Sequence, residues 1–183
     1  MKIPVKDLVL AALFAALSVV MTIFVSIPLP FSPVPLTGQT FVVMLAGAML
    51  GSRRGALSQL IYILLGAAGL PVFSGGMGGI GVLVGPRGGF LLGFVIGAYI
   101  IGKLVEKFDR PSLVYLLFAT SVGGVLAVYI PGILQLSLVT GLSLSQAAWS
   151  MLYYIPGDVI KVAASSLLIQ RMLAAGVRRV GQS

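Results

Sequence analysis

An aspartate and a lysine, Asp158 and Lys161, lie three residues apart inside an apolar stretch near the carboxyl end of the chain. A charge at the centre of a bilayer costs about 2.5–3.5 kcal/mol even on the most lenient insertion scale, so such residues usually serve a function. Helical spacing puts both on one stripe with Tyr154, which we expect to face the interior of a helix bundle. Arg87 follows a glycine and a proline and can approach the same cavity from outside. These four residues define the candidate site.

The charges of this site suit a small anion that also carries hydrogen-bond donors. Two cations and one carboxylate sum to +1, and Asp158 can accept hydrogen bonds from N–H groups of a ligand. Thr37 and Gln39 can add polar contacts, while aromatic side chains enclose an apolar part of the ligand. The aromatic candidates are Phe73, Phe90, Trp149, Tyr153 and Tyr154.

The composition is that of an integral membrane protein. Of 183 residues, 58% are hydrophobic and 9% are charged, and the mean hydropathy is +1.12. A soluble domain of this length cannot bury so much apolar surface. No polar linker divides the sequence, so we expect a single domain over residues 1–183. The formal net charge is +8, but the basic residues are dispersed, so orientation in the membrane explains them better than binding to nucleic acid does.

The chain contains no Cys, no His and no Asn. This excludes disulfides, metal sites with imidazole or thiolate ligands, and nucleophiles activated by histidine. We therefore expect no metal site, no cofactor and no enzymatic activity. Glycine motifs at residues 76–81 and 97–103 resemble nucleotide sites, but the first lacks a βαβ unit and the second has Leu104 where Ser or Thr must follow the lysine. Any coupling to ATP must come from another chain.

Six apolar segments predict an all-α, polytopic membrane protein with six transmembrane helices. They span residues 8–27, 37–50, 56–68, 89–101, 112–140 and 147–173. Ten of the twelve Lys and Arg residues fall on the side that holds both termini, so the positive-inside rule places both termini in the cytoplasm. Prolines 131 and 156, each followed by glycine, predict kinks or breaks in the last two segments. A cleaved signal peptide is the alternative for the first segment, although no cleavage site follows it.

Two external connections have distinctive compositions. Residues 28–36 hold four prolines, which favour an extended segment over a helix. Residues 69–88 are rich in glycine yet also apolar, and a long loop of this kind is usually a lid or a binding loop. The alternative for residues 69–88 is a flexible connector without a binding role.

Small residues repeat at four-residue spacing in the first and fourth segments. The repeats are Ala11 with Ala15, Ala12 with Ala16, and Gly89 with Gly93 and Gly97. Such stripes let helices approach closely inside a membrane. For the glycines we favour packing within the chain, whereas for the alanines both internal packing and a surface for a partner helix stay open.

Four stretches, taken together and in this order, resemble the BioY family, whose members are the biotin-binding S components of energy-coupling factor (ECF) transporters. The stretches are VPLTGQT at 34–40, GLPVFSGG at 69–76, GPRGGF at 85–90 and PGDVIK at 156–161. The resemblance covers essentially the whole chain. It implies a six-helix protein of the plasma or inner membrane that is surrounded by lipid and captures biotin with high affinity from the outside. It also implies delivery through a transmembrane T component and two ATPase subunits.

The same resemblance assigns roles to individual residues. Asp158 and Lys161 resemble the ligand-binding pair of the family. The family's docking surface for the T component resembles a stripe of four alanines in this chain, namely Ala11, Ala12, Ala15 and Ala16. Arg87 departs from the family pattern, which often has a small polar residue here. Biotin fits the residues, since it has a carboxylate, two ureido N–H donors and an apolar body, but composition and spacing alone reach only a small amphipathic anion.

Other interpretations of the ionisable residues stay open at this point. Asp158 and Lys161 can form a structural ion pair at the break after residues 156–157, with Arg87 bound to lipid headgroups. A stand-alone secondary transporter would use the same pair to couple proton flow to the movement of a small amphipathic anion, although the sequence shows no internal repeat. A membrane enzyme has little support, because no nucleophile and base can be assembled around Asp158.

Overall fold

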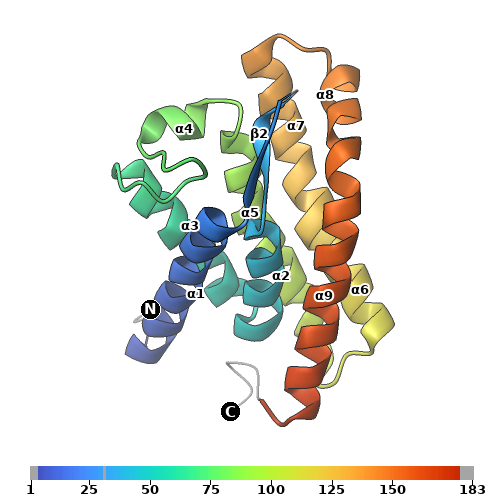
Figure 1. Cartoon of the computed structure of the whole chain (residues 1–183). Helices are drawn as coiled ribbons and strands as arrows, with labels where there is room; N and C mark the ends of the chain where they lie inside the picture. The colour runs from blue at the N-terminus through green and yellow to red at the C-terminus, as the bar shows by residue number, and fades with distance from the viewer. Residues whose placement is uncertain (1–3, 31, 178–183) are drawn as a thin grey trace.

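The computed structural model describes residues 4–30 and 32–177, and it is a helical bundle with one β-hairpin at its upper end (Figure 1). The first half contains α1 (Val5–Phe24), β1 (Ser26–Leu29), β2 (Ser32–Thr37), α2 (Gln39–Leu50), α3 (Ser52–Ala67) and α4 (Ile80–Val84). The second half contains α5 (Gly88–Val105), α6 (Leu113–Ser121), α7 (Ala127–Thr140), α8 (Leu144–Ser150) and α9 (Ile155–Ala174). A π-helical turn (Val122–Leu126) joins α6 to α7, and a 3-10 turn (Met151–Tyr154) joins α8 to α9.

Four of these helical segments are long and apolar enough to cross a membrane. They are Val5–Phe24, Gly88–Val105, Leu113–Thr140 and Leu144–Ala174. Helices α2 and α3, with 12 and 16 residues, reach only about 18 and 24 Å at helical rise, less than the roughly 30 Å of a hydrocarbon core. All residues of α2 except Phe41 are buried, so its neighbours shield it from the surroundings. Six crossings therefore stay a prediction, as does the cytoplasmic orientation.

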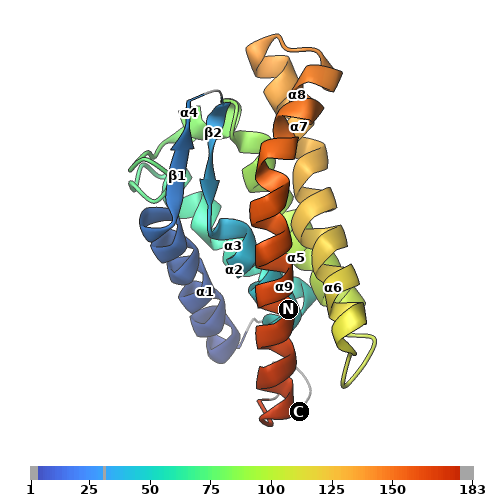
Figure 2. The same cartoon turned by 45° about the vertical axis from the view of Figure 1, so that its right-hand side comes forward.

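The start of α1 and the end of α9 lie at one end of the bundle, while the hairpin, α4 and α8 lie at the other (Figure 2). Contacts between residues agree with this arrangement. An Asp7–Arg54 ion pair of 2.8 Å joins the starts of α1 and α3, and the Glu106 carboxylate after α5 accepts hydrogen bonds from the Ser52 backbone and hydroxyl. The two described ends of the chain are thus on the same side.

The segment between α1 and α2 corrects the all-α expectation. Its prolines do favour extended backbone, as expected, but the two extended pieces also pair as antiparallel strands, with Ser26 opposite Thr37 and Leu29 opposite Ser32. Both strands are edges of a two-stranded sheet, where a proline without an N–H is tolerated. The hairpin is therefore compatible with a proline at every second or third residue.

The proline breaks of the last two segments take different forms. Pro131 lies inside α7, which continues through it after the π-helical turn, so the segment stays one helical run. Pro156 is instead in the first turn of α9, where a missing N–H costs nothing, and the 3-10 turn precedes it. The last apolar segment thus consists of the short helix α8, the 3-10 turn and the long helix α9.

Helix α5 is central and packs closely on α7 through its glycines. A Cβ at Gly93 would lie 2.7 Å from the Val128 Cα, and one at Gly97 would lie 2.3 Å from the Gly123 carbonyl oxygen. Real side chains cannot come so close, so both positions require glycine. The prediction that the glycine stripe serves packing inside the chain is confirmed.

Candidate functional site

A cavity at the hairpin end of the bundle brings together almost all of the predicted ligand-binding residues. The space inside it is small, about 70 Å³. Eight of the ten candidate residues named from the sequence line it: Thr37, Gln39, Phe73, Arg87, Phe90, Tyr154, Asp158 and Lys161. They come from β2, α2, the 69–79 loop, the start of α5 and the last span. Sequence positions up to 124 residues apart thus meet around one space.

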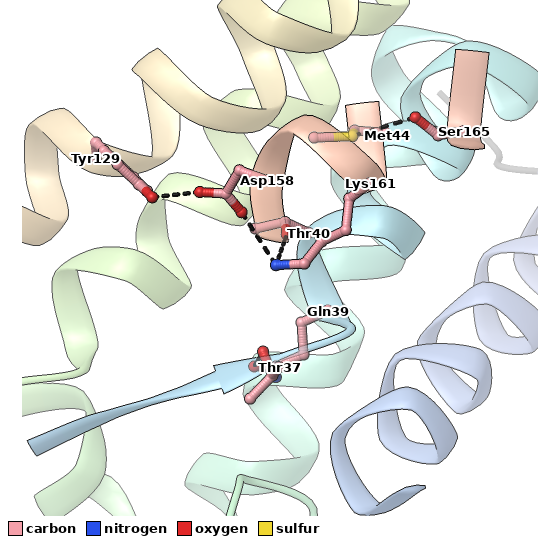
Figure 3. A network of polar contacts seen from close by, with 8 residues as sticks. All are labelled: Thr37, Gln39, Thr40, Met44, Tyr129, Asp158, Lys161 and Ser165. Carbon is pink, nitrogen blue, oxygen red and sulfur yellow. Dashed lines mark hydrogen bonds and ion pairs between the residues drawn. The ribbon is translucent and has the colours of Figure 1, made fainter. Parts of the chain in front are cut away.

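In the cavity wall Asp158 is buried and Lys161 is partly buried, and both have definite partners (Figure 3). Lys161 Nζ lies 3.0 Å from Asp158 Oδ1 and donates a second hydrogen bond, of 3.1 Å, to the Thr40 hydroxyl. The Tyr129 hydroxyl donates to the other carboxylate oxygen, Oδ2. An ammonium group has three N–H bonds, and among the described residues Lys161 finds acceptors for two of them. One N–H therefore stays available to a ligand.

Tyr129 and Thr40 are cavity residues that the sequence did not point to. Tyr129 belongs to a long apolar helix, where an aromatic ring is usually packing, and its edge also contacts Phe90, with the ring centroids 6.4 Å apart. The available signal was a phenol hydroxyl in the interior of an apolar span, since such a group needs a hydrogen-bond partner. Thr40 follows Gln39 directly and carries no signal of its own.

Thr37 and Gln39 form a second polar group on the β2 side of the cavity. The Thr37 hydroxyl donates to Gln39 Oε1 at 2.9 Å, and Gln39 Nε2 donates to the Tyr62 hydroxyl at 2.5 Å. Figure 3 shows the two side chains close to each other and apart from the Asp158–Lys161 pair. The cavity therefore offers polar groups on two sides, with apolar wall between them.

Arg87 lies at the mouth and joins the β-hairpin to the 69–79 loop. Its Nε donates to the Pro33 carbonyl at 2.8 Å, and its Nη1 donates to the carbonyl and hydroxyl oxygens of Ser74 at 3.0 and 3.1 Å. Partial burial lowers the pKa of the guanidinium, and the nearby phenol of Tyr154 opposes that shift. Within the described structure Nη2 makes no hydrogen bond. A ligand at the mouth can therefore still use two N–H donors of Arg87.

The remaining wall is apolar and aromatic. Phe73 belongs to the 69–79 loop, is only 2% exposed and lines the cavity. This apolar loop therefore packs against the cavity wall, in agreement with its composition. The other apolar members include Phe90, Leu91, Phe94, Val128 and Met151. The site combines a buried ion pair, a cation at the mouth and a hydrocarbon-lined interior.

Comparison with known proteins decides the family. The BioY family model matches residues 1–178. The chain is 43% identical over 169 residues to a biotin transporter BioY of Rhizobium etli, covering 89% of this chain and 90% of that protein. It is 38% identical over 174 residues to a biotin transporter BioY of Thermotoga maritima, covering 95% and 99%. The chain belongs to the BioY family.

A solved structure supports the same relationship at the level of the fold. This BioY chain matches the S-component for biotin from an ECF-type ABC transporter with a TM-score of 0.86 at 30% identity, covering 92% of this chain and 90% of the other. The match extends over nearly the whole bundle, so the cavity lies on a shared scaffold. The protein is therefore a multi-pass membrane protein of a transporter family.

Two of the wall residues predicted from the sequence do not line the cavity. Trp149 is 69% exposed, and Tyr153, which the sequence also offered, is 66% exposed. The inward stripe runs instead through Ala147, Met151 and Tyr154, and its spacing of three and four residues continues to Asp158. Trp149 and Tyr153 lie off this stripe, so their aromatic character suggested wall positions that helical spacing does not give them.

The alanine stripe of the BioY chain divides into two faces. Ala11 and Ala15 are 0% and 1% exposed and pack inside the chain, so they are not accessible to a partner. Ala12 and Ala16 are exposed on the opposite side of α1. The proposed docking surface is reduced to this outer pair, whose role stays a prediction.

Proposed function

We propose that this chain is the biotin-binding S component of an ECF-type importer in the plasma or inner membrane. The observation that carries the proposal is the buried Asp158–Lys161 pair in the wall of an apolar cavity, in a chain that belongs to a family of biotin transporters. A buried ion pair is weak evidence for stability, since apolar packing could replace it. Its position in the wall of this cavity supports a role in binding.

The geometry suggests how the two ends of biotin are distinguished. Asp158 and Lys161 present an acceptor and a donor 3.0 Å apart, which suits a ureido group, because its N–H and C=O also lie side by side. The spare Nη2 of Arg87 at the mouth suits a carboxylate. The hydrocarbon part of biotin would then lie between them, against Phe73 and Phe90. In this orientation the ring system enters first and the carboxylate stays near the outside.

This orientation is testable by comparing biotin with biotin methyl ester. The ester should bind the parent protein about 10- to 150-fold more weakly, as expected for the loss of about 1.5–3 kcal/mol from a charged hydrogen bond. In Arg87→Gln the ratio of the two affinities should fall toward one. Because Arg87 also holds the two loops together, the ratio is more informative than either affinity alone. An unchanged ratio in Arg87→Gln would place the carboxylate elsewhere in the cavity.

The importer function requires partners, because the sequence offers no nucleotide site. The proposed partners are a transmembrane T component and two ATPase subunits, and the exposed face of α1 at Ala12 and Ala16 is the proposed contact. Liposomes with this chain alone should show no concentrative biotin uptake, with or without a proton gradient. Liposomes that also contain the T component and ATPases should accumulate biotin when ATP is supplied. Uptake by the lone chain driven by a proton gradient would instead establish a secondary transporter.

A further inference from the structure

A row of buried polar side chains runs between α1 and α3, away from the charged pair. Ser18, Thr22, Gln59 and Tyr62 are each 0% or 1% exposed. Ser18 donates to Gln59 Oε1 at 3.3 Å, and the Thr22 hydroxyl lies 3.3 Å from that of Tyr62. None of these four residues lines the ligand cavity. Their polar groups therefore serve something other than direct ligand contact.

Tyr62 connects this row with the cavity and with the loop above it. Its hydroxyl accepts the 2.5 Å hydrogen bond from Gln39 Nε2, and it donates to the Val72 carbonyl at 3.1 Å. A phenol has one proton and two acceptor sites, so these two bonds can exist together. Gln39 lines the cavity, and Val72 belongs to the loop that bears Phe73 and Ser74. One hydroxyl thus contacts both a ligand-facing amide and the backbone of the covering segment.

The ring of Tyr62 is also part of the seat of that loop. It meets Phe73 edge to face, with centroids 5.6 Å apart and an interplanar angle of 87°. Phe73 lies directly on Gly66 of α3, where a Cβ would approach the ring to 2.0 Å. The Gly66 carbonyl accepts a 2.7 Å hydrogen bond from the Gly79 N–H at the far end of the loop. The loop is therefore clamped onto α3 at Val72, Phe73 and Gly79.

We propose that Tyr62 is a positioning residue that couples ligand contact at Gln39 to seating of the loop over the cavity. A ligand that holds the Gln39 amide in place keeps its Nε2 on the Tyr62 hydroxyl, and this leaves the hydroxyl proton directed at Val72. When Gln39 has no ligand contact, the hydroxyl can turn to its third neighbour, Thr22, and the loop loses one of its clamps. This coupling rests on the proposed function, because it assumes that biotin occupies the cavity.

The test uses Tyr62→Phe, which keeps the ring against Phe73 and removes only the hydroxyl. In lipid nanodiscs this variant of the full chain should release biotin about 3- to 10-fold faster than the parent, the effect of one lost neutral hydrogen bond. At saturating biotin, hydrogen exchange in residues 70–79 should be less protected than in the parent. The matched control is Thr120→Val, which removes a buried hydroxyl that contacts Ser166 at 3.0 Å between α6 and α9. The control should leave both the release rate and the loop protection unchanged.

A second variant covers the case in which Tyr62→Phe does not fold. Gln39→Leu leaves Tyr62 in place but removes the amide that donates to its hydroxyl, so loop protection at saturating biotin should fall in this variant too. Unchanged release and unchanged loop protection in Tyr62→Phe, or unchanged protection in Gln39→Leu, would overturn the coupling. A parent protein that fails to bind biotin would instead overturn the proposed function.

Discussion

Two ion pairs of similar length lie toward opposite ends of the described bundle, and their surroundings differ. Asp7 and Arg54, 2.8 Å apart, join the starts of α1 and α3, where an arginine can reach the interface with its long side chain. Asp158 and Lys161, 3.0 Å apart, belong to one helix and face an apolar cavity. The first pair connects two elements of the fold. The second adds little to α9 itself, and its lysine keeps an N–H that points to no described acceptor.

This difference indicates how structural and functional charges can be told apart in a membrane protein. Burial and distance do not separate the two pairs, because Asp7 and Asp158 are 8% and 5% exposed. The ligand cavity does separate them, because Asp158 and Lys161 line it and Asp7 and Arg54 do not. The comparison predicts that removing the Asp158–Lys161 pair lowers ligand affinity, whereas removing the Asp7–Arg54 pair lowers the stability of the fold.

The largest effect is expected from Lys161→Ala. Losing a charged hydrogen bond in a dry pocket costs about 1.5–3 kcal/mol, so biotin affinity should fall about 10- to 150-fold. Asp158→Asn should also weaken binding. Isothermal titration of the purified chain measures both, with Lys103→Ala at the exposed end of α5 as the matched lysine control. Parent-like affinity in both variants would show that the inner pair is structural after all.

The two faces of α1 should respond differently to added bulk. Replacing Ala12 and Ala16 by Leu should leave biotin binding to the isolated chain nearly unchanged but reduce uptake in cells that contain the whole transporter, because bulk prevents close approach of a partner helix. Replacing Ala11 and Ala15 by Leu should instead lower thermal stability, since overpacking a buried position typically costs about 1–3 kcal/mol. Equal loss of binding and uptake in the outer pair would indicate internal packing on both faces.

Arg54→Ala should lower stability and leave the ligand site intact. Its pair is partly exposed, with side-chain exposures of 28% and 12%, so the loss should fall between that of exposed and buried pairs, about 1–3 kcal/mol. Thermal unfolding should show a midpoint lower by several degrees, while the biotin affinity stays within about twofold of the parent in titration. A large loss of affinity would contradict the assignment of this pair to the fold.

The smallest effect is expected from Tyr129→Phe. The Asp158 carboxylate loses one hydrogen bond but keeps Lys161, so the biotin affinity should fall only about 2- to 10-fold. Tyr99→Phe, on the outer side of α5, provides the matched control and should bind normally. If Tyr129→Phe weakens binding as much as Lys161→Ala does, Tyr129 contacts the ligand directly.

The sequence revealed the charged residues of the site but not the neighbours that hold them. An Asp or Lys in an apolar span is a local signal, because its cost in the bilayer does not depend on tertiary structure. Tyr129 and Thr40 act through partners on other helices, and no local pattern separates them from packing residues. Trp149 was misplaced because it was chosen for its aromatic ring, whereas helical spacing puts it off the stripe of Ala147, Met151 and Tyr154.

The elements of the fold were predictable to different degrees. The long apolar helices α1, α5 and α9 follow from hydropathy, although their ends differ by several residues from those expected. The hairpin was predicted as extended but not as paired, because strand pairing depends on where the chain turns back. Helices α2 and α3 are too short for a hydropathy argument to establish that they cross the membrane.

Native mass spectrometry of the purified chain with added biotin tests the central claim most directly. The account predicts one biotin per chain in the parent and in Arg54→Ala, and loss of that complex in Lys161→Ala at the same biotin concentration. A complex that persists in Lys161→Ala and disappears in Arg54→Ala would contradict the roles of the two ion pairs. A parent chain that carries a different small molecule and does not exchange it for biotin would contradict the ligand itself.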